Sequence, residues 1–218
     1  MESRNAFVSS SVADECSVII GHASPAYLYG LEAIIDAIPG LHVTASARTR
    51  SELLTHCAAM RSGIVMVDAE LGEAQIDSQV RDLMTAAPNI RVMLMLATPL
   101  PVNVRVAIET GALGVVAQHD DVQVLRTAMQ ALTLRRRFIS PLAAEQLAIA
   151  FTSTPLTMRE LGVLVRLSQG KCNKEIARDL AIAYGTVKSH LHAIMSKLDV
   201  STRTEALVKA SDLGILRL

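Results

Sequence analysis

The chain has 218 residues, half of them hydrophobic but only 3% aromatic, and its 21 Lys and Arg balance its 21 Asp and Glu. This length accommodates one large or two small domains with an aliphatic core. A zero formal charge excludes a protein that is basic throughout, yet the charge is unevenly divided. Residues 151–218 hold ten Lys and Arg against six Asp and Glu, whereas residues 1–150 hold eleven against fifteen. The C-terminal third therefore carries the cation surplus.

The N-terminal residues and the cysteines bear on location and cofactors. Residues 1–15 are polar and mixed in charge, which predicts a tail rather than a signal peptide. No stretch approaches the ~18 uninterrupted apolar residues of a membrane helix. Cys16, Cys57 and Cys172 show neither metal-ligand spacing nor a disulfide framework. We therefore expect a soluble cytoplasmic protein with no membrane partner, no metal and no cofactor.

From Cys16 onward, short apolar runs alternate with amphipathic segments. We expect strands over 17–20, 42–45, 64–67, 92–96 and 114–117, and helices over 25–37, 50–60, 73–86, 103–110 and 122–134. Continuous apolar strands are typical of parallel sheets covered on both faces. The alternation predicts an α/β domain over residues 16–135 with a flavodoxin-like, doubly wound sheet. Ligands of such sheets bind at the carboxyl ends of the strands, so the residues just after each strand are the site candidates.

Several motifs lie at or near these strand ends. They are Val18-Ile19-Ile20, Pro25, Gly30-Leu31, Val65-Met66-Val67-Asp68 and Gly111-Ala112-x-Gly114. With them, the segment from Cys16 to Leu134 resembles the receiver domain of response regulators. The resemblance implies that Asp68 is the candidate phosphoacceptor. It also implies an acidic pair after the first strand to hold Mg²⁺, a hydroxyl after the fourth strand and a Lys after the fifth.

This chain departs from the receiver pattern at each of those partner positions. The acidic pair is replaced by His22 and Ala23, the hydroxyl by Leu96 and the Lys by Gln118. Without these groups Mg²⁺ has no sound site and a transferred phosphoryl charge is poorly compensated. We therefore predict an atypical receiver that acts independently of phosphorylation. Three alternatives stay open: phosphorylation of Asp68 with Thr98 or His22 as a partial substitute, a small ligand in the apolar crevice around these residues, or constitutive dimerisation.

Residues 136–153 are predicted to be an interdomain linker. Arg135-Arg136-Arg137 stands at the expected end of the last receiver helix, where cations suit the helix dipole, and we interpret the run as solvated. Pro141 and the stretch Thr152-Ser153-Thr154-Pro155 favour a connecting segment, with room for a helical piece over 142–151.

Residues 154–218 carry helix signals in close succession. Thr157 and Glu160 form a capping-box pattern that begins a helix. Gly170 is suited to end that helix, and Asn173 is predicted to be the N-cap of a second helix over 174–181. After a short turn, a third helix is expected over 185–198. This spacing predicts a helix-turn-helix.

The third helix has one apolar face and one polar face. Spacings of i, i+4, i+7 and i+11 place four apolar side chains on a buried face: Val187, Leu191, Ile194 and Leu198. The neighbouring face is polar and slender, with Lys188, Ser189, His192 and Ser196. A helix of this cross-section fits the major groove of B-form DNA, which is about 12 Å wide. The alternative is a three-helix interaction module whose charges are merely solvated.

Four motifs in this region carry a second resemblance. They are Leu156-Thr157-x-Arg159-Glu160, Asn173-Lys174-Glu175-Ile176-Ala177, Thr186-Val187-Lys188-x-His190 and Lys197-Leu198-x-Val200-x-x-Arg203-x-x-Ala206. They are similar to the DNA-binding domain of LuxR/NarL-type transcription regulators. The resemblance implies an all-α tetrahelical domain whose last helix, from Thr202 to Leu213, can serve as a dimer contact.

The chain departs from the LuxR pattern at two positions. Ala183 stands where the family usually has a capping Ser, which weakens that cap by about 1 kcal/mol. Cys172 stands where Ser is common, and we expect a small buried thiol there.

These patterns together predict a sequence-specific transcription regulator that binds double-stranded promoter DNA as a homodimer, with half-sites about 10 bp apart. Base reading is expected from Lys188, Ser189 and His192. Phosphate contacts are expected from Asn173, Lys174, Thr186, Lys197 and Arg203. The chain has no P-loop, no Gly-x-Ser-x-Gly elbow and no paired catalytic carboxylates, so we expect no enzymatic activity. An adaptor that senses a ligand or sequesters another factor is the alternative.

Overall fold

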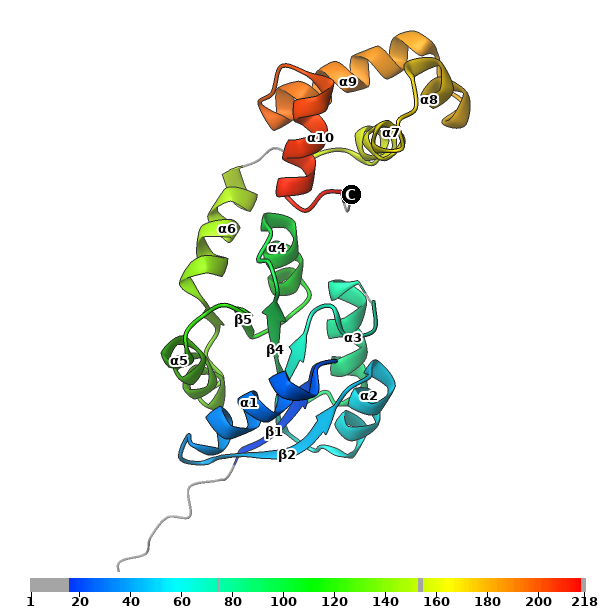
Figure 1. Cartoon of the computed structure of the whole chain (residues 1–218). Helices are drawn as coiled ribbons and strands as arrows, with labels where there is room; N and C mark the ends of the chain where they lie inside the picture. The colour runs from blue at the N-terminus through cyan, green and yellow to red at the C-terminus, as the bar shows by residue number, and fades with distance from the viewer. Residues whose placement is uncertain (1–15, 74, 153–154, 217–218) are drawn as a thin grey trace, which may run out of the picture.

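The computed structural model describes residues 16–73, 75–152 and 155–216. The N-terminal tail expected over residues 1–15 lies outside this part of the chain. An α/β domain comes first, and a purely helical domain follows at its α4 and α6 end (Figure 1). Within the described ranges, no helix is both long enough and apolar enough to span a bilayer.

A parallel sheet forms the centre of the first domain. Its strands are β1 (Cys16–Gly21), β2 (Leu41–Ala47), β3 (Gly63–Asp68), β4 (Ile90–Leu96), β5 (Gly114–Ala117) and β6 (Phe138–Ile139). They lie in the order β2-β1-β3-β4-β5-β6, and all neighbours pair in parallel. The first five strands follow the flavodoxin-like order, which confirms the predicted fold. Asp68 ends β3, in the middle of the carboxyl edge of the sheet.

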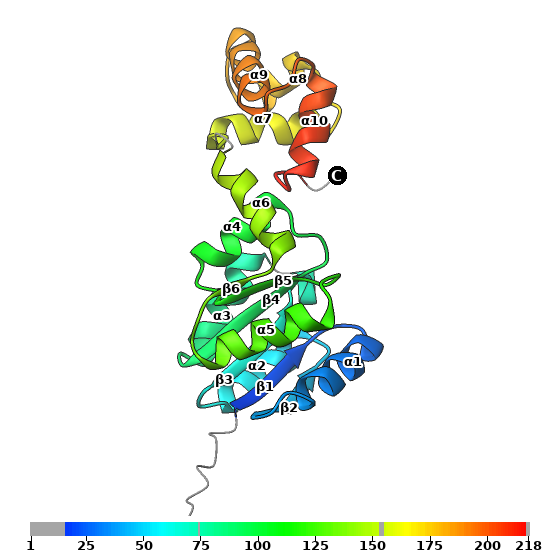
Figure 2. The same cartoon turned by 90° about the vertical axis from the view of Figure 1, so that its left-hand side faces the viewer.

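Five helices cover the two faces of this sheet. They are α1 (Pro25–Asp36), α2 (Arg50–Ala59), α3 (Ile76–Ala86), α4 (Pro101–Glu109) and α5 (Val122–Thr133). Helices α1 and α5 pack on one face, and α2, α3 and α4 pack on the other (Figures 1 and 2). Strands β3 and β5 are buried along their whole length because both faces are covered, which explains their uninterrupted apolar sequences.

The helix expected over 73–86 begins later than predicted. A short 3₁₀ turn, η1 (Leu71–Glu73), comes first, and α3 begins at Ile76. Gly72 within the turn has a φ of +77°, a left-handed conformation that interrupts a right-handed helix.

Residues 136–153, predicted to be a linker, pack on the first domain as a strand and a helix, and the helical piece expected over 142–151 is present as α6. Strand β6 extends the sheet, with the Phe138 N–H donating to the Leu113 carbonyl at 3.0 Å and the Ser140 N–H donating to the Val115 carbonyl at 2.9 Å. Helix α6 (Pro141–Thr152) then packs against α4 and β5 with Ala143 fully buried (Figure 2). The Arg135–Arg137 run follows the end of α5 rather than belonging to it, because Arg135 adopts a φ of +54°.

Four helices make up the second domain. They are α7 (Met158–Ser168), α8 (Asn173–Asp179), α9 (Tyr184–Leu198) and α10 (Arg203–Asp212), the four expected of a tetrahelical domain. On α9 the predicted face packs into the core of this domain, with Val187, Ile194 and Leu198 buried and Leu191 half-buried. The predicted capping box of α7 is present, since the Thr157 N–H donates to Glu160 Oε2 at 2.6 Å and the Glu160 N–H donates to Thr157 Oγ1 at 3.3 Å.

Two expectations at the start of α8 are wrong. The N-cap is Cys172 rather than Asn173, because the Cys172 N–H donates to Glu175 Oε2 at 2.7 Å. Glu175 stands three residues after Cys172, which is the capping-box spacing, whereas it is only two residues after Asn173. The cap position also leaves the Cys172 thiol exposed instead of buried. At α9 the expected weakness is present: Ala183 is the N-cap and makes no side-chain capping bond.

The two domains meet where the end of α10 approaches the start of α4. The Val102 N–H donates to the Leu213 carbonyl at 3.4 Å. Gly214 follows with a φ of +73°, and a Cβ atom there would lie 2.9 Å from side-chain atoms of Leu100 and Val102. Only glycine combines this backbone conformation with so close an approach.

Lys197 is expected to stabilise the second domain through Glu160, whose side chain is nearly buried and lies 2.7 Å from the Lys197 ammonium. In Lys197→Met, that carboxylate loses its cation, and we expect the free energy of unfolding at pH 7 to fall by about 2 kcal/mol in urea titrations. The matched Lys209→Met change removes an exposed ammonium and should cost about 0.5 kcal/mol or less.

The same substitution has a predictable pH dependence. Burial alone would raise the pKa of Glu160, but hydrogen bonds from Lys197 and Thr157 outweigh it and lower the pKa. A carboxyl group with a lowered folded-state pKa contributes stability that is complete above its unfolded pKa of about 4.3 and disappears as the pH falls through the folded value. The difference between wild type and Lys197→Met should therefore shrink toward about pH 3. A difference that stays constant with pH would contradict this account.

Candidate functional site

The outer face of α9 presents polar side chains to solvent. Lys188, Ser189 and His192, the predicted base-reading residues, are all exposed on this helix. Their opposite face is fixed in the core by Val187 and Ile194, so the helix is held at a defined rotation. The Ser189 hydroxyl donates to the Gly185 carbonyl at 3.2 Å, which leaves its lone pairs free to accept a hydrogen bond.

Tyr184 is a member of this face that the sequence interpretation missed. The ring of Tyr184 is 45% exposed at the first turn of α9, and the Lys188 ammonium lies 5.1 Å from its centroid. This is a cation–π contact, which restrains a long side chain that would otherwise sample many rotamers. The i, i+4 spacing of an aromatic residue and a lysine on one helix was the available signal.

The predicted phosphate-contacting residues do not form one group. Lys174, Thr186 and Arg203 are exposed at or near the N-termini of α8, α9 and α10. Helix N-termini carry unpaired N–H groups and a partial positive charge, which favours phosphate. The Arg203 guanidinium also donates to the Lys171 carbonyl at 3.4 Å, which brings α10 and the start of α8 together.

The other two residues of that set, Asn173 and Lys197, are placed differently. Asn173 is half-buried, and in the described part of the chain its side-chain oxygen is buried without a hydrogen-bond partner. Lys197 is at the far end of α9, where its ammonium bonds to Glu160 at 2.7 Å and to the Pro155 carbonyl at 3.2 Å. The Lys197 ammonium is therefore already paired with Glu160 of α7 and with the Pro155 carbonyl just before that helix.

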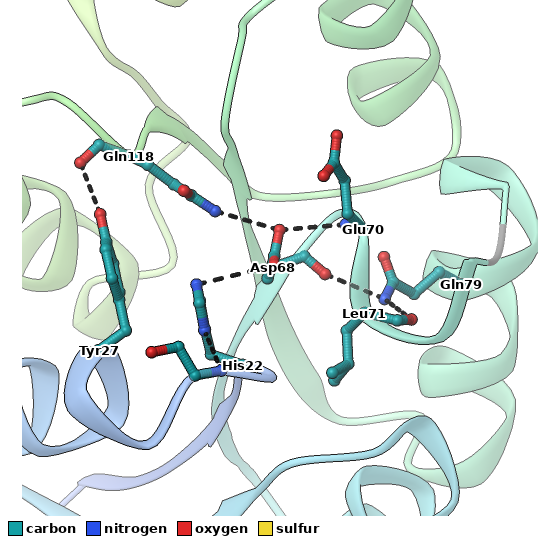
Figure 3. Close-up of polar contacts among 8 residues, drawn as sticks. His22, Tyr27, Asp68, Glu70, Leu71, Gln79 and Gln118 are labelled. Carbon is teal, nitrogen blue, oxygen red and sulfur yellow. Dashed lines mark hydrogen bonds and ion pairs between the residues drawn. The ribbon is translucent and has the colours of Figure 1, made fainter.

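Asp68 is nearly buried and is surrounded by hydrogen-bond donors of the protein itself (Figure 3). Its Oδ1 accepts from Gln118 Nε2 at 3.2 Å and from the Glu70 N–H at 3.1 Å. Its Oδ2 lies 3.7 Å from His22 Nε2. The strand-end rule therefore correctly placed His22 and Gln118 beside Asp68.

Tyr27 closes this arrangement into a ring of contacts, which the sequence interpretation did not foresee. Its ring stacks on the His22 imidazole, with centroids 4.4 Å apart and planes 5° from parallel. Its hydroxyl donates to the Gln118 carbonyl at 2.8 Å. Burial, and then the negative charge of Asp68, raise the pKa of this hydroxyl, so it remains a donor. We call His22, Tyr27, Asp68 and Gln118 the Asp68 ring.

The residues around Asp68 do not fit a magnesium ion. Mg²⁺ prefers oxygen ligands in octahedral geometry, whereas the side chains that contact this carboxylate present an imidazole and an amide NH₂ group. The carboxylate of Glu70 extends away from Asp68 (Figure 3). Leu96, at the hydroxyl position, is 2% exposed and belongs to the core on the α2–α4 face. Thr98 is exposed beyond the end of β4.

Comparisons with known proteins agree with both parts of the chain. Residues 154–210 match the family model described as "Bacterial regulatory proteins, luxR family". The response regulator RamR of Streptomyces coelicolor is 31% identical over 153 residues, which cover 69% of this chain and 73% of RamR. The DNA-binding transcriptional activator DevR/DosR of Mycobacterium tuberculosis is 27% identical over 192 residues, 84% of this chain and 88% of that protein.

The solved structures support the fold. A structure of two RcsB dimers bound to two parallel DNAs has a TM-score of 0.71 with 19% identity, and covers 91% of this chain and 99% of that one. The likeness extends over both domains. Together with the sequence relatives, it confirms the resemblance seen in the receiver-like and helix-turn-helix motifs. The chain belongs to the LuxR-type response regulators, a family of DNA-binding transcription regulators.

Proposed function

We propose that this regulator binds specific promoter DNA through α9 and that its output does not depend on phosphorylation of Asp68. The observation that carries the proposal is the Asp68 ring: the carboxylate is nearly buried, already accepts hydrogen bonds from Gln118 and Glu70, and lies 3.7 Å from His22 Nε2. In this respect the domain is an atypical receiver.

Charge makes phosphorylation at this position unfavourable. A phosphoryl group brings about 1.5 to 2 negative charges, which need nearby cations or a metal. The described side chains that contact Asp68 are the imidazole of His22 and the neutral amide of Gln118, and neither is a lysine or an arginine. A further anion here would be buried with little compensation, which is costly. Asp68 Oδ1 already accepts two hydrogen bonds and Oδ2 faces His22 at 3.7 Å, so an incoming phosphoryl group meets a member of the ring at either oxygen.

The proposed DNA interface combines base readers and phosphate contacts. Lys188, Ser189 and His192 read base edges from the exposed side of α9. Lys174, Thr186 and Arg203 contact phosphates, together with Asn173 at the start of α8. Lys197 belonged to this set in the sequence prediction, but its bonds to Glu160 and Pro155 support a structural role instead.

We propose that the protein acts as a homodimer in the cytoplasm, where promoter DNA is found. RcsB, a similar structure, is described as dimers on DNA. On α10, Val208 is 55% exposed, which supports this helix as a contact between copies. Half-sites would then lie about 10 bp apart.

Two lysine variants separate base reading from phosphate contact. Lys188→Ala should reduce the free energy of binding to the specific site by about 1–3 kcal/mol and relax the sequence preference. Lys174→Ala should weaken binding to all sequences about equally, and should reduce the slope of log K against log salt concentration by about 1. Mobility-shift titrations on specific and scrambled duplexes at several salt concentrations measure both. Arg61→Ala, an exposed charge on the first domain, is the control and should change neither.

If Lys188→Ala leaves the ratio of specific to nonspecific affinity unchanged, the assignment of Lys188 as a base reader is wrong. If the wild type retards no promoter fragment even at low salt, the adaptor alternative is favoured over direct regulation.

Tyr184 should act by positioning Lys188. Tyr184→Phe keeps the aromatic face, so specific affinity should stay within about two-fold, whereas Tyr184→Ala should lose about 0.5–1 kcal/mol of specific binding. In the Lys188→Ala background, the Tyr184→Ala change should have no further effect on specificity. An equal loss with and without Lys188 would show that the ring acts on DNA by itself.

Asp68 should be dispensable for DNA binding. Incubation with acetyl phosphate and Mg²⁺, followed by intact-mass measurement, should add no phosphoryl mass to the wild type, as in the control Asp68→Asn. The two proteins should bind a promoter duplex with affinities within about two-fold, about 0.4 kcal/mol. A phosphoryl adduct on wild type that tightens DNA binding would instead support a conventional phosphorylation switch.

A further inference from the structure

A hollow lies beside the Asp68 ring, between α1 and α5. Its volume is about 240 Å³. Its floor includes Met95 and Val116 of the sheet, each 2% exposed, and its walls include Leu31 and Leu125. The hollow therefore reaches between the two helices down to the sheet, near the carboxyl ends of β4 and β5.

Gly30 leaves this space open. It stands within α1 and lines the hollow, and a Cβ atom built there would meet no atom within 4 Å. Its φ is not in the left-handed region. A glycine inside a helix costs about 1 kcal/mol relative to alanine. Gly30 is exposed, so a larger side chain at this position would extend into the open space at the edge of the hollow.

The size and lining of the hollow define the ligand it fits. A cavity of about 150 Å³ lined by apolar side chains binds benzene, so this larger hollow has room for about one further ring. Aliphatic side chains and the Tyr27 ring make up most of the wall. The charged lining residues in the described part of the chain, Asp120 and Asp121, are both acidic. An anion is therefore disfavoured, and a protonated amine is favoured.

Both carboxylates are held in place at the rim. Asp120 Oδ2 accepts from the Ala117 N–H at 2.7 Å, and Asp121 Oδ1 accepts from the Val124 N–H at 2.8 Å. Each bond occupies one oxygen of a carboxylate that has further acceptor sites. The rim is thus prepared to accept a hydrogen bond from a ligand without rearranging.

Two residues connect the hollow with the Asp68 ring. Tyr27 and Gln118 line the hollow, and they are joined by the 2.8 Å bond from the Tyr27 hydroxyl to the Gln118 carbonyl. A ligand that contacts the aromatic side chain of Tyr27 therefore contacts a residue that stacks directly on His22. Occupancy of the hollow therefore bears on the site where a phosphoryl group would act in a conventional receiver.

We propose that this hollow binds a small one- or two-ring aromatic molecule that is neutral or carries an amine, and that such a ligand is the input to the domain. The second half of this proposal rests on the phosphorylation-independent function proposed above, whereas the binding itself does not. A second copy of the chain is the other possible occupant, and the light-scattering measurement below tests it.

Three probes with one ring system test the proposal on the full chain. They are indole, tryptamine and indole-3-acetate, which are neutral, cationic and anionic at neutral pH. We expect indole to bind, tryptamine to bind at least three-fold more tightly, and indole-3-acetate at least ten-fold more weakly than indole, by ligand-observed NMR titration. No binding by indole or tryptamine, or tightest binding by indole-3-acetate, would overturn the proposal.

Gly30→Leu places a side chain in the hollow and should reduce indole affinity at least ten-fold. Ala58→Leu, the same enlargement of a small exposed residue on α2, should leave it unchanged. Circular dichroism and the urea midpoint verify folding; if Gly30→Leu does not fold, Gly30→Ala, which also removes a helix glycine, should weaken indole by at least three-fold. Wild-type affinity in the folded Gly30 variant would place the probe elsewhere and refute the site.

Two further measurements distinguish ligand binding from self-association at the hollow and test whether the ligand affects DNA binding. Light scattering with and without Gly30→Leu tests the second copy: a dimer lost in the variant, with no indole binding by wild type, assigns the hollow to self-association and refutes a ligand site. Indole should change promoter affinity at least three-fold in wild type and not in Gly30→Leu. Because NMR binding is measured without DNA, failure of the DNA predictions leaves the binding result intact.

Discussion

The buried carboxylate of Asp68 is the constraint on which the first domain depends. A carboxylate removed from water must find donors, and here the Glu70 N–H after β3 and Gln118 after β5 donate to it, while His22 after β1 lies 3.7 Å from its Oδ2. In meeting this need, the chain joins segments far apart in sequence at one edge of the sheet. His22 and Gln118, which contact Asp68, also contact Tyr27 and so orient its side chain in the wall of the neighbouring hollow.

Much of this fold could be predicted because its cause is local. Strand β3 is a continuous apolar run, since both its faces are covered, and Thr157 with Glu160 marks the start of α7 by spacing alone. Strand β6 gave no such signal, and α6 was expected only as a helical piece of a linker, not as a helix packed on the first domain. Two residues, Phe138 and Ile139, become a strand only because β5 offers its edge, and α6 is apolar nearly all round, so it has no clear periodicity.

The candidate sites divide in the same way. The strand-end rule placed His22 and Gln118 beside Asp68, because parallel strands end at one edge, but nothing local indicated that Tyr27 would stack on His22. Lys197 shows the opposite failure: its position on α9 suggested a phosphate contact, and its partner Glu160 lies 37 residues away in the chain. A cation on a recognition helix is available to DNA only if it is not already paired with a carboxylate of the same domain, as Lys197 is with Glu160.

The contact between the domains bears on how a signal could pass. One 3.4 Å hydrogen bond, from Val102 to Leu213, and the close approach of Gly214 to Leu100 hold α10 against the start of α4. Relative motion is the default for two domains joined in one chain, and the polar face of α9 is already exposed in this arrangement. Helix α4 directly follows β4, and Met95 in that strand forms part of the floor of the hollow. The same strand thus leads from the floor of the hollow to the helix whose start touches the DNA-binding domain.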